Sequence, residues 1–214
     1  MYKKLGRAVY ISHLDIMRTF QRSFKRAGIN VKHTEGFNPH PYISIALPLS
    51  LGYNGECEFL DTELLDNMPC EEIVSRLNSS LPEGIEALIA YEGGHPVRDI
   101  AYSEYEISLE YDNGIPEDGV KKLSELFYND EIVVIKKSKR GEVETNIAPM
   151  IRKTKVYEAD GKIFVSAILA AGNNMSLNPE YIIRAIEKYL PELKPDFAEF
   201  TRKNVLTENL ATFR

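Results

Sequence analysis

The chain of 214 residues is long enough for one large domain or two small ones, and its 43% hydrophobic and 27% charged residues argue against wholesale disorder. No stretch approaches the roughly 18 apolar residues that cross a bilayer, and no signal-like segment follows Met1, so we predict a cytoplasmic protein without a membrane partner. The two cysteines, Cys57 and Cys70, stand apart, as is usual in a reduced compartment, and leave no array of three cysteines for an iron–sulfur cluster.

The net charge of −6 is divided unevenly along the chain. Residues 1 to 52 carry eight lysines and arginines against two acidic residues, a net charge of +6, so the rest of the chain carries −12. Three of the four histidines also lie in this positive segment. A positive end on an acidic body suits a surface that meets phosphates, although uneven surface charge without a function would have the same composition.

In the first half of the chain, the periodicity of apolar residues predicts the order strand, helix, strand, strand, helix, strand. The expected elements are a strand at Arg7 to Ile11, a helix at Ser12 to Ala27, strands at Tyr42 to Leu47 and Glu56 to Thr62, a helix at Cys70 to Ser80 and a strand at Ile85 to Tyr91. This order is that of the split βαβ, or ferredoxin-like, arrangement.

Glycine and proline cluster at Glu92 to Pro96, which predicts a linker, and the same order of elements then follows again. The expected elements are a strand at Tyr102 to Tyr111, a helix at Pro116 to Tyr128, a hairpin of Ile132 to Ser138 with Val143 to Ile147 across Lys139-Arg140-Gly141, a second hairpin of Lys153 to Tyr157 with Lys162 to Leu169, a helix at Pro179 to Tyr189 and a strand at Glu199 to Leu206. We therefore predict an α+β protein of two tandem ferredoxin-like domains, residues 1–94 and 95–214.

The first predicted helix has two different faces. Ser12 and Asp15 have the spacing of a capping box, which predicts that the helix begins there. Apolar residues recur at three- and four-residue intervals and should face the core: Met17, Phe20, Phe24 and Ala27. Cations recur at similar intervals on another face, with no acid after Asp15: Arg18, Arg22, Lys25 and Arg26. Such a helix could meet phosphates, whereas most charged helix faces are only solvated.

The loop after this helix, Lys32 to Pro41, contains a glycine and two prolines that restrict its backbone. It would present Glu35, Asn38 and His40 in a fixed geometry. A histidine oriented by a carboxylate suits general acid–base chemistry, so His13 and His40 are candidate catalytic residues. Binding without chemistry and a purely structural turn are the alternatives, and the spacing of the histidines matches no strong metal-ligand pattern, so we predict no metal.

A second group of cations follows in the other half of the chain: Lys136, Lys137, Lys139, Arg140, Arg152, Lys153 and Lys155. They would extend a phosphate-contacting surface or simply protect hairpin edges from aggregation. The chain has neither a P-loop nor a G-x-S-x-G elbow, which disfavours nucleotidase and hydrolase functions.

These N-terminal motifs resemble the radical SAM-linked protein family, a bacterial domain of unknown function that is fused to, or encoded beside, a cobalamin-binding-type radical SAM protein. The residues that carry the resemblance are Gly6-Arg7, Tyr10-Ile11-Ser12-His13-Leu14-Asp15, Arg26-Ala27-Gly28, Glu35-Gly36-Phe37-Asn38-Pro39-His40-Pro41, and Pro48-Leu49 before Gly52. More loosely it extends through Asn146-Ile147-Ala148-Pro149, Asn178-Pro179-Glu180 and Thr201-Arg202. The family usually has a fuller strand before the Gly-Arg pair and a basic residue where this chain has Ala148.

The resemblance implies a stand-alone accessory partner of a radical SAM enzyme in RNA- or ribosome-related metabolism, and it implies no established activity. The iron–sulfur cluster and S-adenosylmethionine would be held by that partner, and this chain would need no cofactor. Our first hypothesis is an RNA-binding or substrate-presenting module whose contacts are Arg18, Arg22, Lys25, Arg26, Lys32, Glu35, Asn38 and His40, with His13 beside them. The alternatives are an RNA-processing or RNA-modifying enzyme that uses His13 or His40, and a protein–protein adaptor that binds no nucleic acid.

Overall fold

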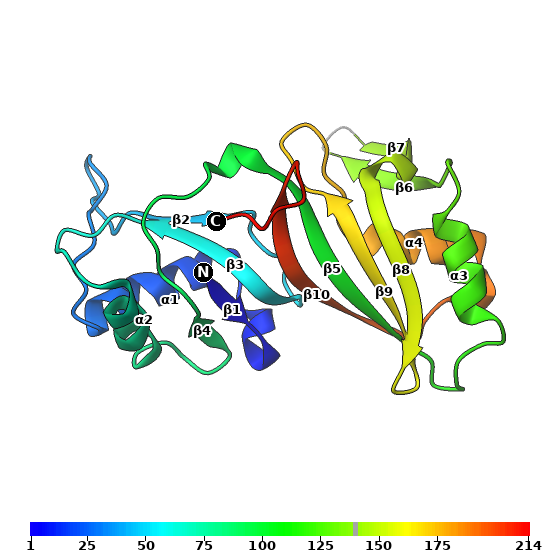
Figure 1. The fold of residues 1–214 in the computed structure, drawn as a ribbon, viewed down its shortest axis with the longest axis horizontal. Helices are drawn as coiled ribbons and strands as arrows, with labels where there is room; N and C mark the ends of the chain where they lie inside the picture. Colours follow the sequence, from blue (N-terminus) through cyan, green and yellow to red (C-terminus); the bar gives the residue numbers. More distant parts are fainter. Residues whose placement is uncertain (139–140) are drawn as a thin grey trace. The chain divides into compact units, whose positions relative to one another are not determined.

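The computed structural model describes residues 1–138 and 141–214 and has the α+β architecture that the sequence predicts (Figure 1). The chain forms two compact units, one of Met1–Val97 together with Arg214 and one of Arg98–Phe213. The linker glycines and prolines placed the expected division at residues 94 and 95, three residues before the observed one. No helix in the described ranges is both long and apolar enough to span a membrane.

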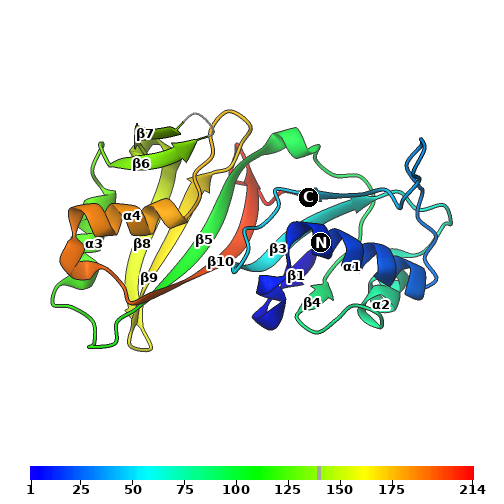
Figure 2. The same ribbon diagram turned by 180° about the vertical axis from the view of Figure 1, so that it is seen from behind.

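The first unit is a four-stranded antiparallel sheet with two α-helices. Its elements are β1 (Tyr2–Lys4), η1 (Gly6–Tyr10), α1 (His13–Arg26), β2 (Ile43–Ala46), β3 (Asn54–Thr62), α2 (Cys70–Asn78) and β4 (Ile85–Ala87). Across the sheet the strands follow the order β4, β1, β3, β2, and every neighbouring pair is antiparallel. α1 lies across one face of this sheet and is nearest the viewer in Figure 2.

One hydrophobic core joins α1 to the sheet and to α2. Phe20 and Phe24 are each only 2% exposed, and the ring of Phe20 meets the ring of Tyr2 edge-on at 4.8 Å between centroids. The same cluster includes Leu77 of α2 and Ile85 of β4. Because both helices share this core with the strands, the predicted apolar stripe of α1 is confirmed.

The predicted first strand, Arg7 to Ile11, is wrong, because these residues form the 3-10 helix η1 and the first strand lies earlier, at Tyr2–Lys4. Gly6 has a φ of +58°, which turns the chain out of the extended conformation. Two short-range backbone hydrogen bonds, from Ala8 N–H to the Leu5 carbonyl and from Ile11 N–H to the Ala8 carbonyl, then close the turns. Ala8 and Val9, two of the apolar residues that suggested a strand, are instead buried within this helical turn.

The second unit repeats the plan of the first with an additional hairpin. Its elements are η2 (Val97–Asp99), β5 (Ile100–Glu110), α3 (Gly119–Phe127), β6 (Val133–Ser138), β7 (Gly141–Asn146), η3 (Ala148–Met150), β8 (Ile151–Ala159), β9 (Lys162–Ala170), α4 (Glu180–Tyr189), η4 (Pro191–Leu193) and β10 (Phe197–Thr207). The sheet order is β10, β5, β9, β8, again antiparallel throughout. β6 pairs with β7 as a separate hairpin, whose expected turn residues Lys139 and Arg140 lie outside the described residues.

Residues at every second position of the central strands bury one face of this sheet beneath the helices. Fully buried side chains come from β5, β9, α3 and α4: Ile107, Leu109, Ile163, Val165, Leu123, Ile182 and Ile186. α4 lies across this face in Figure 2. Residues at alternate positions of the strands and at three- and four-residue intervals of the helices therefore form one core.

Tyr111, just after β5, provides a test of the second unit at alkaline pH. Its hydroxyl donates a hydrogen bond of 3.0 Å to the Leu193 carbonyl, and burial, with a smaller contribution from Asp196, raises its pKa from 10.0 to about 12. The folded state thus holds this proton more tightly than the unfolded state. Its stabilising contribution is complete below the unfolded pKa of 10.0 and is lost as the pH rises through about 12.

We expect Tyr111→Phe to lower the free energy of unfolding by about 1 kcal/mol at neutral pH, through loss of the hydrogen bond. It should also reduce the decline in stability above pH 10.0. Urea denaturation at a series of pH values measures both effects. Tyr10→Phe is the control, because the Tyr10 side chain is 74% exposed and should change neither quantity. If the stability of Tyr111→Phe declined above pH 10.0 as steeply as that of the parent protein, the role given to the Tyr111 proton would be wrong.

Candidate functional site

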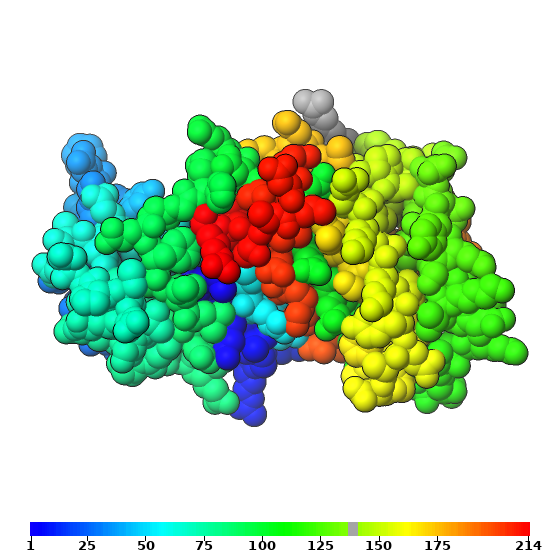
Figure 3. Space-filling view, viewed as in Figure 1, coloured from blue at the N-terminus to red at the C-terminus, as the bar shows by residue number. Residues whose placement is uncertain are grey.

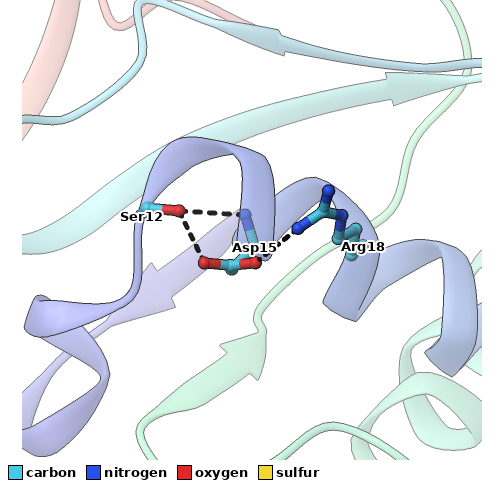
Figure 4. A network of polar contacts seen from close by, with 3 residues as sticks. All are labelled: Ser12, Asp15 and Arg18. Atoms are coloured by element: carbon cyan, nitrogen blue, oxygen red, sulfur yellow. Dashed lines mark hydrogen bonds and ion pairs between the residues drawn. The ribbon is translucent and has the colours of Figure 1, made fainter.

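The first turn of α1 is fixed by a polar network of three residues (Figure 4). The Ser12 hydroxyl accepts a hydrogen bond from the Asp15 N–H at 3.2 Å and donates one to the Asp15 carboxylate at 2.7 Å. Arg18 donates to the other carboxylate oxygen at 3.1 Å. The hydrogen bond from Ser12, followed by that from Arg18, lowers the pKa of Asp15. The predicted cap is confirmed, and Arg18 is oriented by Asp15 while its side chain remains 64% exposed.

The cationic stripe, which we define as Arg18, Arg22, Lys25 and Arg26, lies on the exposed side of α1. Arg26 donates to the Ser80 carbonyl at 2.6 Å and to the Ser23 hydroxyl at 3.0 Å, so it joins the end of α1 to the loop after α2. The side chains of Arg22 and Lys25 make no hydrogen bond or ion pair with any residue of the described ranges. The stripe thus combines two cations with structural partners and two that are available to a ligand.

The predicted site loop, Lys32 to Pro41, leaves the first unit as a narrow excursion that stands out in Figures 1 and 3. Backbone hydrogen bonds pair its two arms, from Tyr42 N–H to the Lys32 carbonyl at 2.7 Å and from Thr34 N–H to the His40 carbonyl at 2.8 Å. The Lys32 ammonium pairs with the Glu63 carboxylate at 2.9 Å, which raises the pKa of Lys32. Lys32 therefore secures the base of the loop and is not an unpaired cation.

The His40 imidazole is held in one orientation by its own loop. Its Nδ1 lies 3.1 Å from the Asn38 carbonyl and 3.2 Å from the Thr34 hydroxyl, and its backbone N–H donates to that hydroxyl at 3.2 Å. A carbonyl oxygen can only accept, so Nδ1 donates to Asn38 in the neutral tautomer that carries its hydrogen on Nδ1. In that tautomer Nε2 is an acceptor on an exposed ring, as a general base or a hydrogen-bonding ligand site requires.

The other loop residues are presented to solvent. Glu35 and Asn38 are exposed, and Phe37 between them is fully exposed at the tip. Sequence reasoning missed both Phe37 and the orienting role of Thr34. The signal for Phe37 was a large apolar residue in a turn-rich loop that has no apolar partner at strand or helix spacing, which is typical of a contact residue more than of a core residue.

His13 is separated from the loop residues. It is the first residue of α1, and the loop begins beyond the last turn of this helix, whose 14 residues span about 20 Å. The structure therefore brings Thr34, Asn38 and His40 together and leaves His13 at the other end of α1. Within residues 1–138 and 141–214, no three His, Cys, Asp or Glu side chains gather in a way that could hold a metal ion.

Comparison with solved structures reveals a similar fold at low sequence identity. A chain of the crystal structure of a Cbf5-Nop10-Gar1 complex matches 95% of this chain at 11% identity with a TM-score of 0.51. The match covers 47% of that chain, so the present protein spans about half of its length, and at this identity the likeness concerns the fold alone. The crystal structure of an unknown protein from Galdieria sulphuraria matches 94% of each chain at 15% identity, with a TM-score of 0.25.

No curated protein matches the chain. A family model does, over residues 1–179, a range that includes the cationic stripe, the site loop and most of the second unit. Its description is "Uncharacterized protein conserved in bacteria (DUF2344)", and the chain belongs to this bacterial family.

Proposed function

We infer that both units are ferredoxin-like. In support, each unit has the order strand, helix, strand, strand, helix, strand, once the β6–β7 hairpin is set aside as an insertion between α3 and β8. In each, the sheet places the fourth strand of this series beside the first, then the third and the second. This is the strand order of two interleaved βαβ crossovers in one antiparallel sheet.

We propose that the protein is a cytoplasmic RNA-binding or substrate-presenting accessory protein that works with a radical SAM enzyme. The observation that carries the RNA-binding part is the cationic stripe, in which the side chains of Arg22 and Lys25 are exposed and make no hydrogen bond or ion pair with any described residue. A helix whose opposite side is locked into a core holds such cations at fixed spacing. Exposed cations at this spacing are best suited to bind the phosphates of a nucleic acid backbone.

The site loop would add specificity to this electrostatic contact. Phe37 offers an exposed ring on which an unpaired base can stack, and His40 offers an oriented acceptor nitrogen. Asn38 can both donate to and accept from a base edge through its side-chain amide. The stripe thus accounts for affinity and the loop for choice of ligand.

Fluorescence anisotropy with a fluorescein-labelled single-stranded oligoribonucleotide of mixed sequence tests the proposal. We expect binding that weakens steeply with salt, and Arg22→Ala/Lys25→Ala should reduce the slope of log affinity against log salt by about 2, one for each lost phosphate contact. The matched control is Arg98→Ala/Lys121→Ala, which removes two exposed cations from the second unit. Binding that does not depend on salt, or an equal effect of both double variants, would contradict the role of the stripe.

The orientation of His40 favours one further candidate function, an RNA-processing enzyme in which its Nε2 accepts a proton from an attacking 2′-hydroxyl. If this is correct, the purified protein cleaves RNA, His40→Ala abolishes cleavage and His13→Ala does not. Cleavage that survives the replacement of His40 would rule this function out.

The radical SAM partner rests on the family resemblance and needs a separate test. Affinity purification of the tagged full-length chain from bacterial cells, followed by identification of the retained proteins and sequencing of the retained RNA, distinguishes the possibilities. A radical SAM protein with RNA supports the proposal. The same partner without RNA would indicate a protein–protein adaptor, and retention of neither would contradict the proposed assembly.

A further inference from the structure

The first unit contains a cavity of about 590 Å³ that the proposed RNA contacts do not use. It lies between the inner side of α1, α2, the end of β3 and the segment after β4. Its volume falls within the range of small-molecule sites, roughly 300–1,000 Å³. The segments around it, residues 61–68, α2 and residues 88–93, lie together on the face shown in Figure 3.

One wall of the cavity is the apolar side of α2. Its apolar residues Ile73, Val74 and Leu77 recur at helical spacing and line the cavity, yet only Leu77 is buried. Phe20 and Phe24 of α1 form part of the opposite wall. An apolar occupant would remove the partly exposed surfaces of Ile73 and Val74 from water, which is favourable in proportion to the apolar area covered.

The mouth of the cavity is acidic. Four carboxylates line it, those of Asp61, Glu63, Asp66 and Glu92, and the lining includes no lysine or arginine among the described residues. Glu63 is paired with Lys32, and Asp66 accepts a hydrogen bond from the Asn30 amide at 2.6 Å.

Asp61 and Glu92 remain as the carboxylates at the mouth that make no hydrogen bond or ion pair with a described residue. The one cationic group in the lining is the amine of Met1, which donates to the Ile89 carbonyl at 2.8 Å. Asp61 acts electrostatically on this amine, yet the four carboxylates of the lining outnumber its one cation. This excess of negative charge beside an apolar chamber favours a ligand that carries positive charge at one end.

We propose that this cavity binds a small molecule with an apolar body and a protonated amine. The body lies against Phe20, Phe24 and Leu77, and the amine meets Asp61 or Glu92 at the mouth. This site shares no residue with the cationic stripe or the loop tip and does not rest on RNA binding.

Displacement of the fluorescent apolar dye N-phenyl-1-naphthylamine from the full chain tests the proposal. Decylamine and decanoate, which have equal alkyl chains and opposite charge, are titrated below their micelle concentrations. We expect decylamine to displace the dye at about a tenfold lower concentration than decanoate, which corresponds to one favourable charge contact. Asp61→Asn/Glu92→Gln should abolish this preference and leave dye binding unchanged. Equal potency of the two amphiphiles in the parent protein would overturn the assignment of charge.

Two experiments locate the binding to the cavity. Val74→Trp fills it and should abolish dye binding, whereas Ser75→Trp, which places the same ring on the exposed side of α2, should not. Decylamine should also slow the alkylation of Cys70, which lines the cavity, by N-ethylmaleimide in the unmodified protein. This second measurement does not depend on the folding of a variant. Undiminished dye binding by folded Val74→Trp, or an unchanged rate of Cys70 alkylation, would overturn the proposal.

Discussion

Replacement of Phe20 by alanine is expected to lower the free energy of unfolding by about 3–5 kcal/mol, the largest effect among the substitutions considered for the first unit. The ring is 2% exposed and contacts the rings of both Tyr2 and Phe24, at 4.8 and 6.5 Å between centroids. Its removal loses the burial of the ring and enlarges a chamber that already borders it. Because α1 packs on the sheet through this stripe, the loss should affect the whole unit.

Guanidinium denaturation followed by circular dichroism measures the Phe20→Ala effect. Leu14→Ala is the matched control, since Leu14 belongs to the same helix but is 66% exposed, and it should change the stability by no more than about 0.5 kcal/mol. A loss below about 1 kcal/mol for Phe20→Ala would mean that α1 does not depend on this contact.

Gly84→Ala is expected to destabilise the first unit by roughly 2–4 kcal/mol, through backbone strain and a steric clash together. Gly84 has a φ of +86°, a conformation that L side chains rarely adopt. A Cβ at this position would lie 2.5 Å from the Leu5 carbonyl oxygen and 2.8 Å from the Ala8 Cβ. Gly84 also accepts a hydrogen bond from the Leu5 N–H at 2.8 Å, so the backbone there has little freedom to move away.

Gly114 separates the two causes. It has the same φ of +86°, but a Cβ there would meet no atom within 4 Å. Gly114→Ala should therefore cost only the conformational part, about 1 kcal/mol. Equal losses for the two variants, measured by thermal and chemical denaturation, would show that the predicted contact with Leu5 and Ala8 is relieved in solution.

The helix α1 was predictable within one residue at each end because independent signals agree there. Ser12 supplies the cap, the apolar spacing supplies the buried face, and Gly28 ends the helix with a φ of +66°. The spacing missed Ile16, which is buried, and overstated Met17, which is only partly buried. Local patterns therefore identified the helix and its buried side, while the exact stripe depended on how the helix packs against the sheet.

Apolar periodicity could not predict the strand β1 because two of its three residues are lysines, and only the family resemblance suggested a strand before Gly6. Lys4 is buried, and its ammonium donates to the Val9 carbonyl at 3.3 Å. A buried lysine is tolerated only where its ammonium has a hydrogen-bond acceptor. Here the acceptor is a backbone carbonyl of η1. No periodicity rule anticipates a hydrogen bond of this kind.

The candidate site was predictable as a set of residue types and not as a set of contacts. The exposure of the cationic stripe followed from helical spacing. The bond from Arg26 to Ser80 and the ion pair of Lys32 with Glu63 join residues 54 and 31 positions apart, so only the fold reveals that these cations have partners. The cavity beside α2 is assembled from several separate segments and left no sequence pattern at all.

α1 lies on the side of the first unit that faces the viewer in Figure 2, whereas the segments around the cavity lie on the opposite side, shown in Figure 3. This separation of the cations from the carboxylates has a kinetic consequence. A unit with separated charges has an electric dipole, so an approaching polyanion turns it before contact. Encounters that begin with the acidic side are repelled, and those that begin with α1 are accelerated. Association with a polyanion should thus be fast at low ionic strength and become slower as added salt screens the field. The rate of dissociation should change less.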